Sequence, residues 1–262
     1  MLFSATELDY LRESLASVPP IRPDARAATQ SRPVEYFTDY IPSANGSARV
    51  VTADGSQCIV GLKTKVVPTH NDLISVSVSI NGVKSNDKLI SSLQSTLHHT
   101  FVCCPQLLNR LKLNNKYAFR LYIDCVVLSC TSNPLGLLST CIFHALKTGQ
   151  IAKMIAPEIQ DNLDEIPQFY DNWEDSISIC EGWVPPILVI VAIVGPNILV
   201  DPTDVEQQVA EAVLCISYKD GKISSPMRIL DSGNSTFLNG FDPMRLPEVV
   251  SIASTAAVKS LG

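Results

Sequence analysis

Hydrophobic and polar positions follow two different periods along the chain, and each change of period marks a new element. In the first part, alternating or continuous apolar runs bounded by turn residues predict strands over Ala48–Ala53, Gln57–Val67, Leu73–Ile80 and Tyr117–Cys130. Apolar side chains at helical spacing predict helices over Asp87–Val102 and Leu135–Leu146. Asp54-Gly55 and Asn81-Gly82 are typical turn dipeptides and separate the strands.

The second part repeats this order on a smaller scale. Strands are predicted over Ile187–Val194, Ile198–Asp201, Leu214–Tyr218 and Lys222–Met227. A C-terminal helix follows, marked by Leu246, Val249, Val250, Ala253 and Ala257. The repetition predicts an α+β fold of pseudo-duplicated strand–helix units, with mixed or antiparallel sheets packed against helices.

Two segments lie outside these series. Ser4 and Glu7 have the spacing of a capping box, which predicts the start of an N-terminal helix. Pro19-Pro20 ends this helix. Between the series, residues 157–183 contain eight acidic residues, no Lys or Arg, and both tryptophans. We therefore predict an N-terminal helix (1–20), a first half (21–156), an acidic crossover (157–183) and a second half (184–262). The crossover is either a docking surface or a solvated connection.

Composition describes a folded globular protein without an overall attraction to nucleic acid. Hydrophobic residues make up 46% and charged residues 18% of the 262 residues, and the net charge is −6. The longest fully apolar run, Ile187–Val194, is far too short to span a bilayer. Charged residues between Glu7 and Glu13 interrupt the apolar stretch that a signal peptide would need. We expect neither a membrane segment nor secretion.

The eight cysteines do not have the spacing of a metal site. No C-x-x-C is present, and Cys58, Cys125, Cys141 and Cys215 lie within apolar segments, as small buried hydrophobic residues do. The four histidines form no ligand set either. We expect free intracellular thiols, no metal and no cofactor.

Several sequence blocks occur in a characteristic order near the N-terminus. They are IRPDAR, SRPVEYF, NGSARVV and DGSQCIVGLKTKVV, all between Ile21 and Val67. This order resembles the opening of RNase PH-like proteins, which include phosphorolytic RNases and the ring subunits of the RNA exosome. With NILVDPTDVEQQVA further on, it is most similar to non-catalytic ring subunits of the eukaryotic exosome core. The resemblance runs from about Ile21 to the C-terminal helix and implies the RNase PH-like fold.

The resemblance also implies where an active site would lie. Active members hold phosphate with arginines on the helix after the first sheet and after the next long strand. Here those positions carry Ser91, Ser95 and His98, and then Leu135. The two catalytic aspartates of the family correspond to Gln207 and Val213, neither of which can bind a metal or act as a general base. These are degenerate active-site positions, and we expect no catalytic residue.

Three acidic residues near these positions leave an alternative open. If the chain were an active phosphate-dependent 3'-to-5' exoribonuclease, Asp201, Asp204 and Glu206 could replace the missing catalytic aspartates. The structural interpretation of this segment is a turn followed by a helix cap. A second alternative is a small-molecule enzyme, but the sequence contains no nucleophile–base set and no glycine-rich phosphate loop from which its site could be built. A generic binding protein outside any exosome would purify as a monomer.

The implied role is structural. The chain would complete a ring of RNase PH-like subunits below RNA-binding cap subunits and above a hydrolytic nuclease, and single-stranded RNA would pass through the channel. Nuclear, nucleolar and cytoplasmic locations are expected; no basic localisation run is visible, so nuclear entry would occur with partners.

Candidate RNA contacts are basic side chains near the long strand. We select Arg110, Lys112 and Lys116 from a wider set that also contains Arg120, Lys63 and Lys65. Such side chains would contact phosphates without reading bases. The alternative is that they are solvated charges beside a strand.

Overall fold

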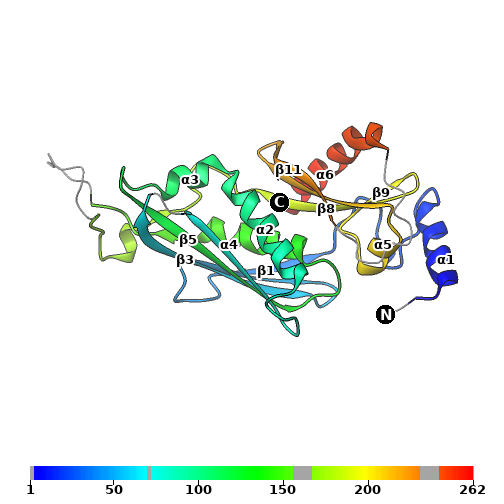
Figure 1. Cartoon of the computed structure of the whole chain (residues 1–262), viewed down its shortest axis with the longest axis horizontal. Coiled ribbons are helices and arrows are strands. Elements are labelled where there is room, and N and C mark those ends of the chain that lie inside the picture. The colour runs from blue at the N-terminus through cyan, green and yellow to red at the C-terminus, as the bar shows by residue number, and fades with distance from the viewer. Residues whose placement is uncertain (1–2, 70–71, 156–166, 231–241, 262) are drawn as a thin grey trace.

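Two sheets form the framework of the molecule (Figure 1). The computed structural model describes residues 3–69, 72–155, 167–230 and 242–261. The first sheet has the order β1-β2-β3-β5-β4 and is mixed, because β4 runs parallel to β5 while the other pairs are antiparallel. Its strands are β1 (Val34–Thr38), β2 (Gly46–Thr52), β3 (Gln57–Pro68), β4 (Ile74–Ile80) and β5 (Tyr117–Ser129).

The second sheet is antiparallel and has the order β11-β10-β8-β9. Its strands are β8 (Ile187–Val194), β9 (Asn197–Val200), β10 (Ala212–Lys219) and β11 (Lys222–Leu230). Two short strands, β6 (Gln150–Ile151) and β7 (Ile177–Ser178), pair separately. The helices are α1 (Ala5–Ala16), α2 (Lys88–Val102), α3 (Pro105–Leu111), α4 (Leu135–Thr148), α5 (Asp204–Val209) and α6 (Leu246–Leu261), with 3-10 turns at Trp173–Asp175 and Pro243–Arg245.

The strand β8 shows how one sequence joins two cores. All eight of its residues are buried, and they alternate between two hydrophobic clusters. Leu188, Ile190, Ala192 and Val194 belong to the cluster shared with the first sheet, and the residues between them belong to the cluster beneath α6. Successive strand residues point to opposite faces, so a strand covered on both sides must be apolar throughout.

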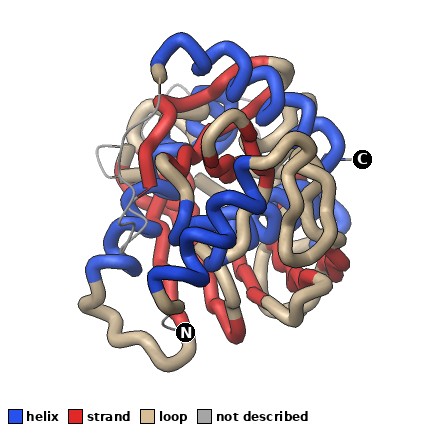
Figure 2. Tube along the Cα trace, turned by 90° about the vertical axis from the view of Figure 1, so that its right-hand side faces the viewer, coloured by secondary structure: helices blue, strands red, loops and turns tan. Residues whose placement is uncertain are grey.

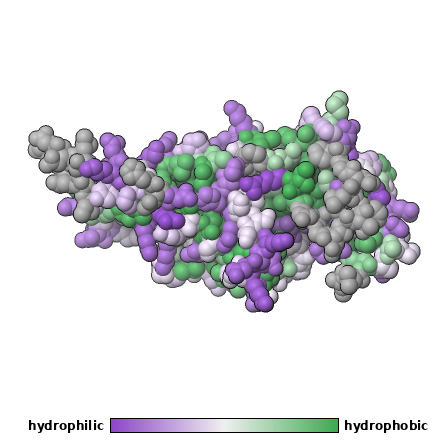
Figure 3. Space-filling view, viewed as in Figure 1, coloured by the Kyte–Doolittle hydropathy of each residue, from purple (hydrophilic) through white to green (hydrophobic). Residues whose placement is uncertain are grey.

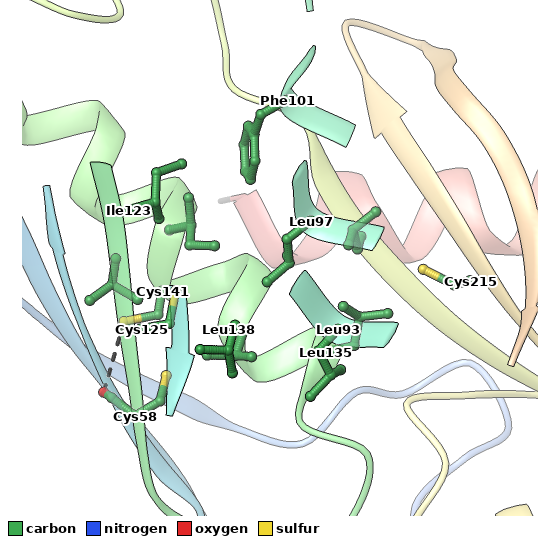
Figure 4. Close-up of a cluster of buried hydrophobic side chains, with 14 of the residues drawn as sticks. Cys58, Leu93, Leu97, Phe101, Ile123, Cys125, Leu135, Leu138, Cys141 and Cys215 are labelled. Carbon is green, nitrogen blue, oxygen red and sulfur yellow. Dashed lines mark hydrogen bonds between the residues drawn. The ribbon is translucent and has the colours of Figure 1, made fainter. Parts of the chain in front are cut away.

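The larger cluster contains residues of both sheets. It contains Leu97 of α2, Leu138 of α4, Ile123 of β5 and Cys215 of β10 (Figure 4). The thiol of Cys141 lies between the sheet and α4 and donates to the carbonyl oxygens of Ala48 and Cys58. α4 contacts both β2 and β8, so it fills the space between the two sheets.

The N-terminal segment packs against the second sheet, at the end of the molecule seen in Figure 2. Ser4 caps α1 through the predicted capping box with Glu7, and α1 contacts α5 and β8. Asn197, at the start of β9, donates to the carbonyl oxygens of Leu15 and Ser17, both at 2.7 Å. The hairpin between β8 and β9 thereby holds the last turn of the helix.

The predicted α+β architecture is confirmed, including its mixed and antiparallel sheets packed against helices. The strand β1 and the short helix α3 were not predicted. The division into halves stays a prediction, and residues 157–166 of the crossover lie outside the described residues. None of the described helices has the length and apolar character that a bilayer crossing requires.

Candidate functional site

The helix α2 presents a polar face where active relatives would hold phosphate. Ser91 and Ser95 are exposed, and the Ser91 hydroxyl donates to the Asp87 carbonyl oxygen at 3.2 Å. His98 is half-buried, with its Nε2 3.7 Å from a carboxylate oxygen of Asp72. The opposite face of α2 packs into the core through Ile90, Leu93, Leu97 and Phe101 and fixes the orientation of the helix. No guanidinium group of α2 therefore faces this site.

Leu135 begins α4 and is fully buried. It belongs to the same core cluster as Leu93 of α2, and both are drawn in Figure 4. The side chain of Asn133 accepts a hydrogen bond from the Leu135 backbone N–H at 3.0 Å and so begins the helix. The start of α4 therefore offers an apolar side chain to the core where an active enzyme would direct a cation to phosphate.

The two predicted carboxylate positions are also uncharged and buried. Gln207 lies in α5, and its side-chain amide donates to the Pro202 carbonyl oxygen at 3.0 Å. Val213 lies in β10, pairs with Ala192 and Leu230, and belongs to the same cluster as Leu93 and Leu135. Leu135 and Val213 therefore meet in one apolar cluster, whereas Ser91 and Ser95 lie exposed on the other face of α2. Their assignment to an ancestral active site stays a prediction.

One cation near this region was not predicted. Arg228 of β11 donates from Nη1 to the Thr96 hydroxyl oxygen of α2 at 3.0 Å. It lies opposite Cys215 in the strand pairing, near the predicted site. Thr96 and Arg228 are far apart in the sequence, so only the tertiary fold could reveal the contact. A single guanidinium held by a hydroxyl does not supply the several arginines that the sequence resemblance implies for active enzymes.

The nearby carboxylates are held by arginines of the N-terminal segment. The Arg22 guanidinium donates from Nε and Nη2 to the two carboxylate oxygens of Glu206, each at 2.7 Å, and both side chains are fully buried. Arg32 donates to Asp201 from Nη2 at 2.6 Å and from Nε at 2.9 Å. Arg26 adds a contact to Asp201 at 3.3 Å. These arginines come from the IRPDAR and SRP blocks that carry the family resemblance.

This network sets the protonation of its acidic members. Burial opposes the ionisation of Asp201, but hydrogen bonds from Arg32 and the charges of Arg32 and Arg26 lower the pKa of Asp201 below its ordinary value. Burial likewise opposes ionisation of Asp54, while hydrogen bonds from Thr131, Thr52 and the Ser56 backbone lower its pKa. A carboxylate whose pKa is lowered and whose oxygens are occupied is a weak general base.

The helix-cap interpretation of this segment is confirmed. Thr203 caps α5, and Glu206 completes a capping box with it. Asp201 has a φ of +51°, in the left-handed region, and its backbone N–H donates to the Ile190 carbonyl oxygen at 2.9 Å. Asp204 accepts from the Gln208 side chain at 2.9 Å. Asp201 therefore shapes the turn, and Glu206 serves both the cap and the buried ion pair.

The three predicted RNA-contact residues differ in their surroundings. Arg110, in the last turn of α3, donates to the Ser178 carbonyl oxygen and forms an ion pair with Glu181. Lys112 follows the last residue of α3 as its C-cap and forms a β-bridge with Ala118. Its side chain is exposed. The backbone N–H of Lys116 donates to the Asn114 side chain at 3.0 Å. Arg110 is thus committed to the protein itself, and the RNA role of all three stays a prediction.

No described group of three or more His, Cys, Asp or Glu side chains is arranged to hold a metal ion.

Burial is the main cause that raises the pKa of Cys180 and of Cys215 to about 12, so these thiols stay protonated. A cavity of about 700 Å³ is lined by Arg32 and Asp201 of the arginine network, together with Tyr36, His144 and Lys259 among others. None of the degenerate positions lines it.

Comparisons with known proteins agree with this structure. The Saccharomyces cerevisiae exosome complex component RRP42 is 37% identical over 98% of this chain and 96% of its own length. The Schizosaccharomyces pombe exosome complex component rrp42 is 29% identical over 100% of this chain and 94% of its own. No family model matches the chain.

Solved structures show the same fold. An archaeal exosome core chain superposes with a TM-score of 0.69 at 21% identity, covering 97% of this chain and 94% of that one. A chain from the structure of the Archaeoglobus fulgidus exosome with RNA bound to the active site superposes with a TM-score of 0.72 at 20% identity. The match covers 97% of this chain and 96% of that one. The fold predicted from the sequence blocks is therefore confirmed. With the yeast relative aligned over nearly its whole length, the chain belongs to the RRP42 family of exosome complex components.

Proposed function

We propose that this chain is a non-catalytic structural subunit of the exosome core ring and supports 3'-to-5' RNA processing and degradation by forming part of the RNA-threading channel. The observation that carries the proposal is the match to RRP42 along the whole chain, combined with uncharged side chains at Ser91, Ser95, Leu135, Gln207 and Val213. Phosphorolysis requires cations to hold phosphate and carboxylates to place a metal or move a proton. Those positions supply neither.

The surface supports a role within an assembly. Hydrophobic side chains reach the exterior in separate patches between hydrophilic ones (Figure 3). Large apolar residues that are at least half exposed include Tyr10, Val18, Ile21, Tyr36, Phe37, Trp173, Ile229, Met244 and Val258. Interfaces between permanently associated subunits bury such side chains. We propose other RNase PH-like ring subunits as the neighbours, with RNA-binding cap subunits and a hydrolytic nuclease above and below.

The proposed location follows from the proposed assembly. A subunit of an RNA-processing complex would occur in the nucleus, nucleolus and cytoplasm. Its sequence contains no basic localisation run, so nuclear entry would take place together with its partners. Imaging of the tagged chain after import of its partners is blocked tests this: nuclear signal should fall, and unchanged nuclear accumulation would contradict the proposal.

The alternative of an active phosphate-dependent exoribonuclease makes a different biochemical prediction. We expect the purified chain to release no nucleoside diphosphate from single-stranded RNA in the presence of inorganic phosphate. Release above background that disappears in both Asp201→Asn and Asp204→Asn would establish the alternative. Release that persists in both variants would point to a contaminating nuclease, because these are the carboxylates that a relocated site would need.

A further inference from the structure

The first sheet has one face packed against helices and one face open to solvent. In β3, Cys58, Val60 and Leu62 are buried, whereas Lys63 and Lys65 are exposed. In β5, Leu121 and Ile123 are buried, whereas Arg120 and Tyr122 are partly exposed. Strand residues alternate between faces, so the buried set marks the inner face and the other set the outer face.

The strand register brings four of these outer residues together. Lys63 lies opposite Tyr122, and Lys65 lies opposite Arg120. The Lys65 ammonium is 5.6 Å and the Arg120 guanidinium 5.3 Å from the centre of the Tyr122 ring. The two strands run side by side in Figure 1. We call Lys63, Lys65, Arg120 and Tyr122 the basic sheet patch.

The patch carries charge that the described part of the protein does not neutralise. Within that part, no ion pair involves any of its three cations. The Nε of Arg120 is buried and has no hydrogen-bond partner among the described residues. Asp124 places one carboxylate further along the same face of β5. Three cations against one anion stand out on a chain whose net charge is −6.

Arg110 shows the opposite situation. Its guanidinium is occupied by the Ser178 carbonyl oxygen and by Glu181. The two exposed lysines of the patch can bind a phosphate without breaking an ion pair of the described residues, whereas an occupied guanidinium must first break its contacts. The outer sheet face is therefore better prepared for an anionic ligand than the end of α3.

We propose that the basic sheet patch binds single-stranded RNA, through phosphate contacts from the two lysines and stacking of a base on the Tyr122 ring or the Arg120 guanidinium plane. The inference rests on the proposed function and gives it a specific surface. Cations grouped around an aromatic ring are the arrangement with which proteins hold single strands without reading their sequence. An acidic peptide would use the cations but would gain little from the ring, so the combination favours RNA.

The first experiment measures binding of the full chain to a fluorescein-labelled oligouridylate of about 12 nucleotides by anisotropy. Lys63→Ala/Lys65→Ala/Arg120→Ala should weaken binding and reduce the magnitude of the slope of log K against log salt by about 1.4, since each of the two lysine–phosphate contacts on a single strand contributes roughly 0.7. Tyr122→Leu should weaken binding about 5-fold or more, and Tyr122→Phe should bind like the wild type because it keeps the ring.

A matched triple variant controls for net charge. Lys88, Lys153 and Lys222 are exposed and lie away from the patch in sequence. Lys88→Ala/Lys153→Ala/Lys222→Ala should keep the wild-type salt slope. Equal losses in both triple variants, wild-type binding by the patch variant, or no binding by the wild-type chain would overturn the proposal. A loss confined to Lys112→Ala would transfer the RNA contact to the end of α3 and would also overturn it.

Photocross-linking of the purified complex with 4-thiouridine RNA supplies a second readout. The peptide that contains Tyr122 should carry the cross-link; labelling confined to other peptides would contradict the proposal. A patch variant that binds RNA normally but no longer joins the complex would identify the patch as a protein interface instead. Failure of the proposed function looks different: the wild-type chain would bind RNA through the patch yet purify without exosome subunits.

Discussion

At the scale of residues, the opening blocks IRPDAR and SRP make buried contacts that the sequence alone does not reveal. Arg22, Arg26 and Arg32 reach from the N-terminal segment to Glu206 and Asp201 beside α5. Arg22 also donates to the Val200 carbonyl oxygen at 3.1 Å. The blocks that indicate the family therefore clamp the chain's beginning onto its second sheet, next to the degenerate positions.

The buried pair Arg22–Glu206 should be sensitive to the loss of either partner. Arg22→Met leaves a buried carboxylate without its cation, and we expect the free energy of unfolding to fall by about 3–5 kcal/mol in urea denaturation. The matched control is Arg12→Met, which removes the more exposed Arg12–Glu211 pair and should cost about 1 kcal/mol or less. Arg22→Met/Glu206→Gln should cost less than the sum of its two single changes, and full additivity would contradict the account.

Asp201 makes a prediction about pH. Its pKa is lowered in the folded protein, so its contribution to stability is present above the unfolded value of about 3.9 and is lost as the pH falls through the folded pKa. Wild type should therefore exceed Asp201→Asn in free energy of unfolding at pH 7, and the difference should shrink below about pH 4. Urea titrations at several pH values test this. If the difference in free energy of unfolding stays constant between pH 7 and pH 3, the ionised carboxylate of Asp201 does not stabilise the folded protein.

At the scale of elements, β2 and the end of α4 meet at two glycines. A Cβ on Gly46 would lie 2.5 Å from the Gly149 Cα and 2.6 Å from the Ala145 carbonyl oxygen. Both obstacles are backbone atoms, which cannot move aside cheaply. The glycine of the NGSARVV block is therefore required by close packing of the strand on the helix.

Gly46→Ala should force this contact apart. We expect a loss of about 1–3 kcal/mol in the free energy of unfolding, measured by urea denaturation. Gly61→Ala, on the neighbouring strand β3, is the control, because a Cβ there would lie 3.4 Å from the flexible end of Ile41. Equal losses from the two substitutions would show that strand glycines as such, and not the approach of α4, determine the effect.

Elements with a covered face were predictable, and elements defined by pairing were not. Ile187–Val194 was predicted with both ends correct because its continuous apolar run is buried on two sides. Every residue of β1 is exposed, so no burial pattern marks it, and it is a strand because it pairs with β2.

The candidate site shows the same division. The uncharged side chains at Gln207 and Val213 are visible in the sequence, whereas the contact between Thr96 and Arg228 joins segments that only the fold brings together. Lys63 and Tyr122 likewise become neighbours only through the register of β3 and β5.

At the scale of the whole molecule, the larger core joins the two sheets, and the exterior keeps many apolar side chains exposed. α4 contacts both sheets, and the main cluster runs from β2 to β10. The exposed aromatic residues, among them Tyr36 and Phe37, suit burial against neighbouring subunits of a ring. Membership in the RRP42 family agrees with this interpretation.

The most direct test of the central claim is native mass spectrometry of the tagged chain, purified gently from its own cells. The account predicts a discrete assembly that holds one copy of this chain together with several different RNase PH-like subunits. A monomer or a homo-oligomer under the same conditions would contradict the ring assignment.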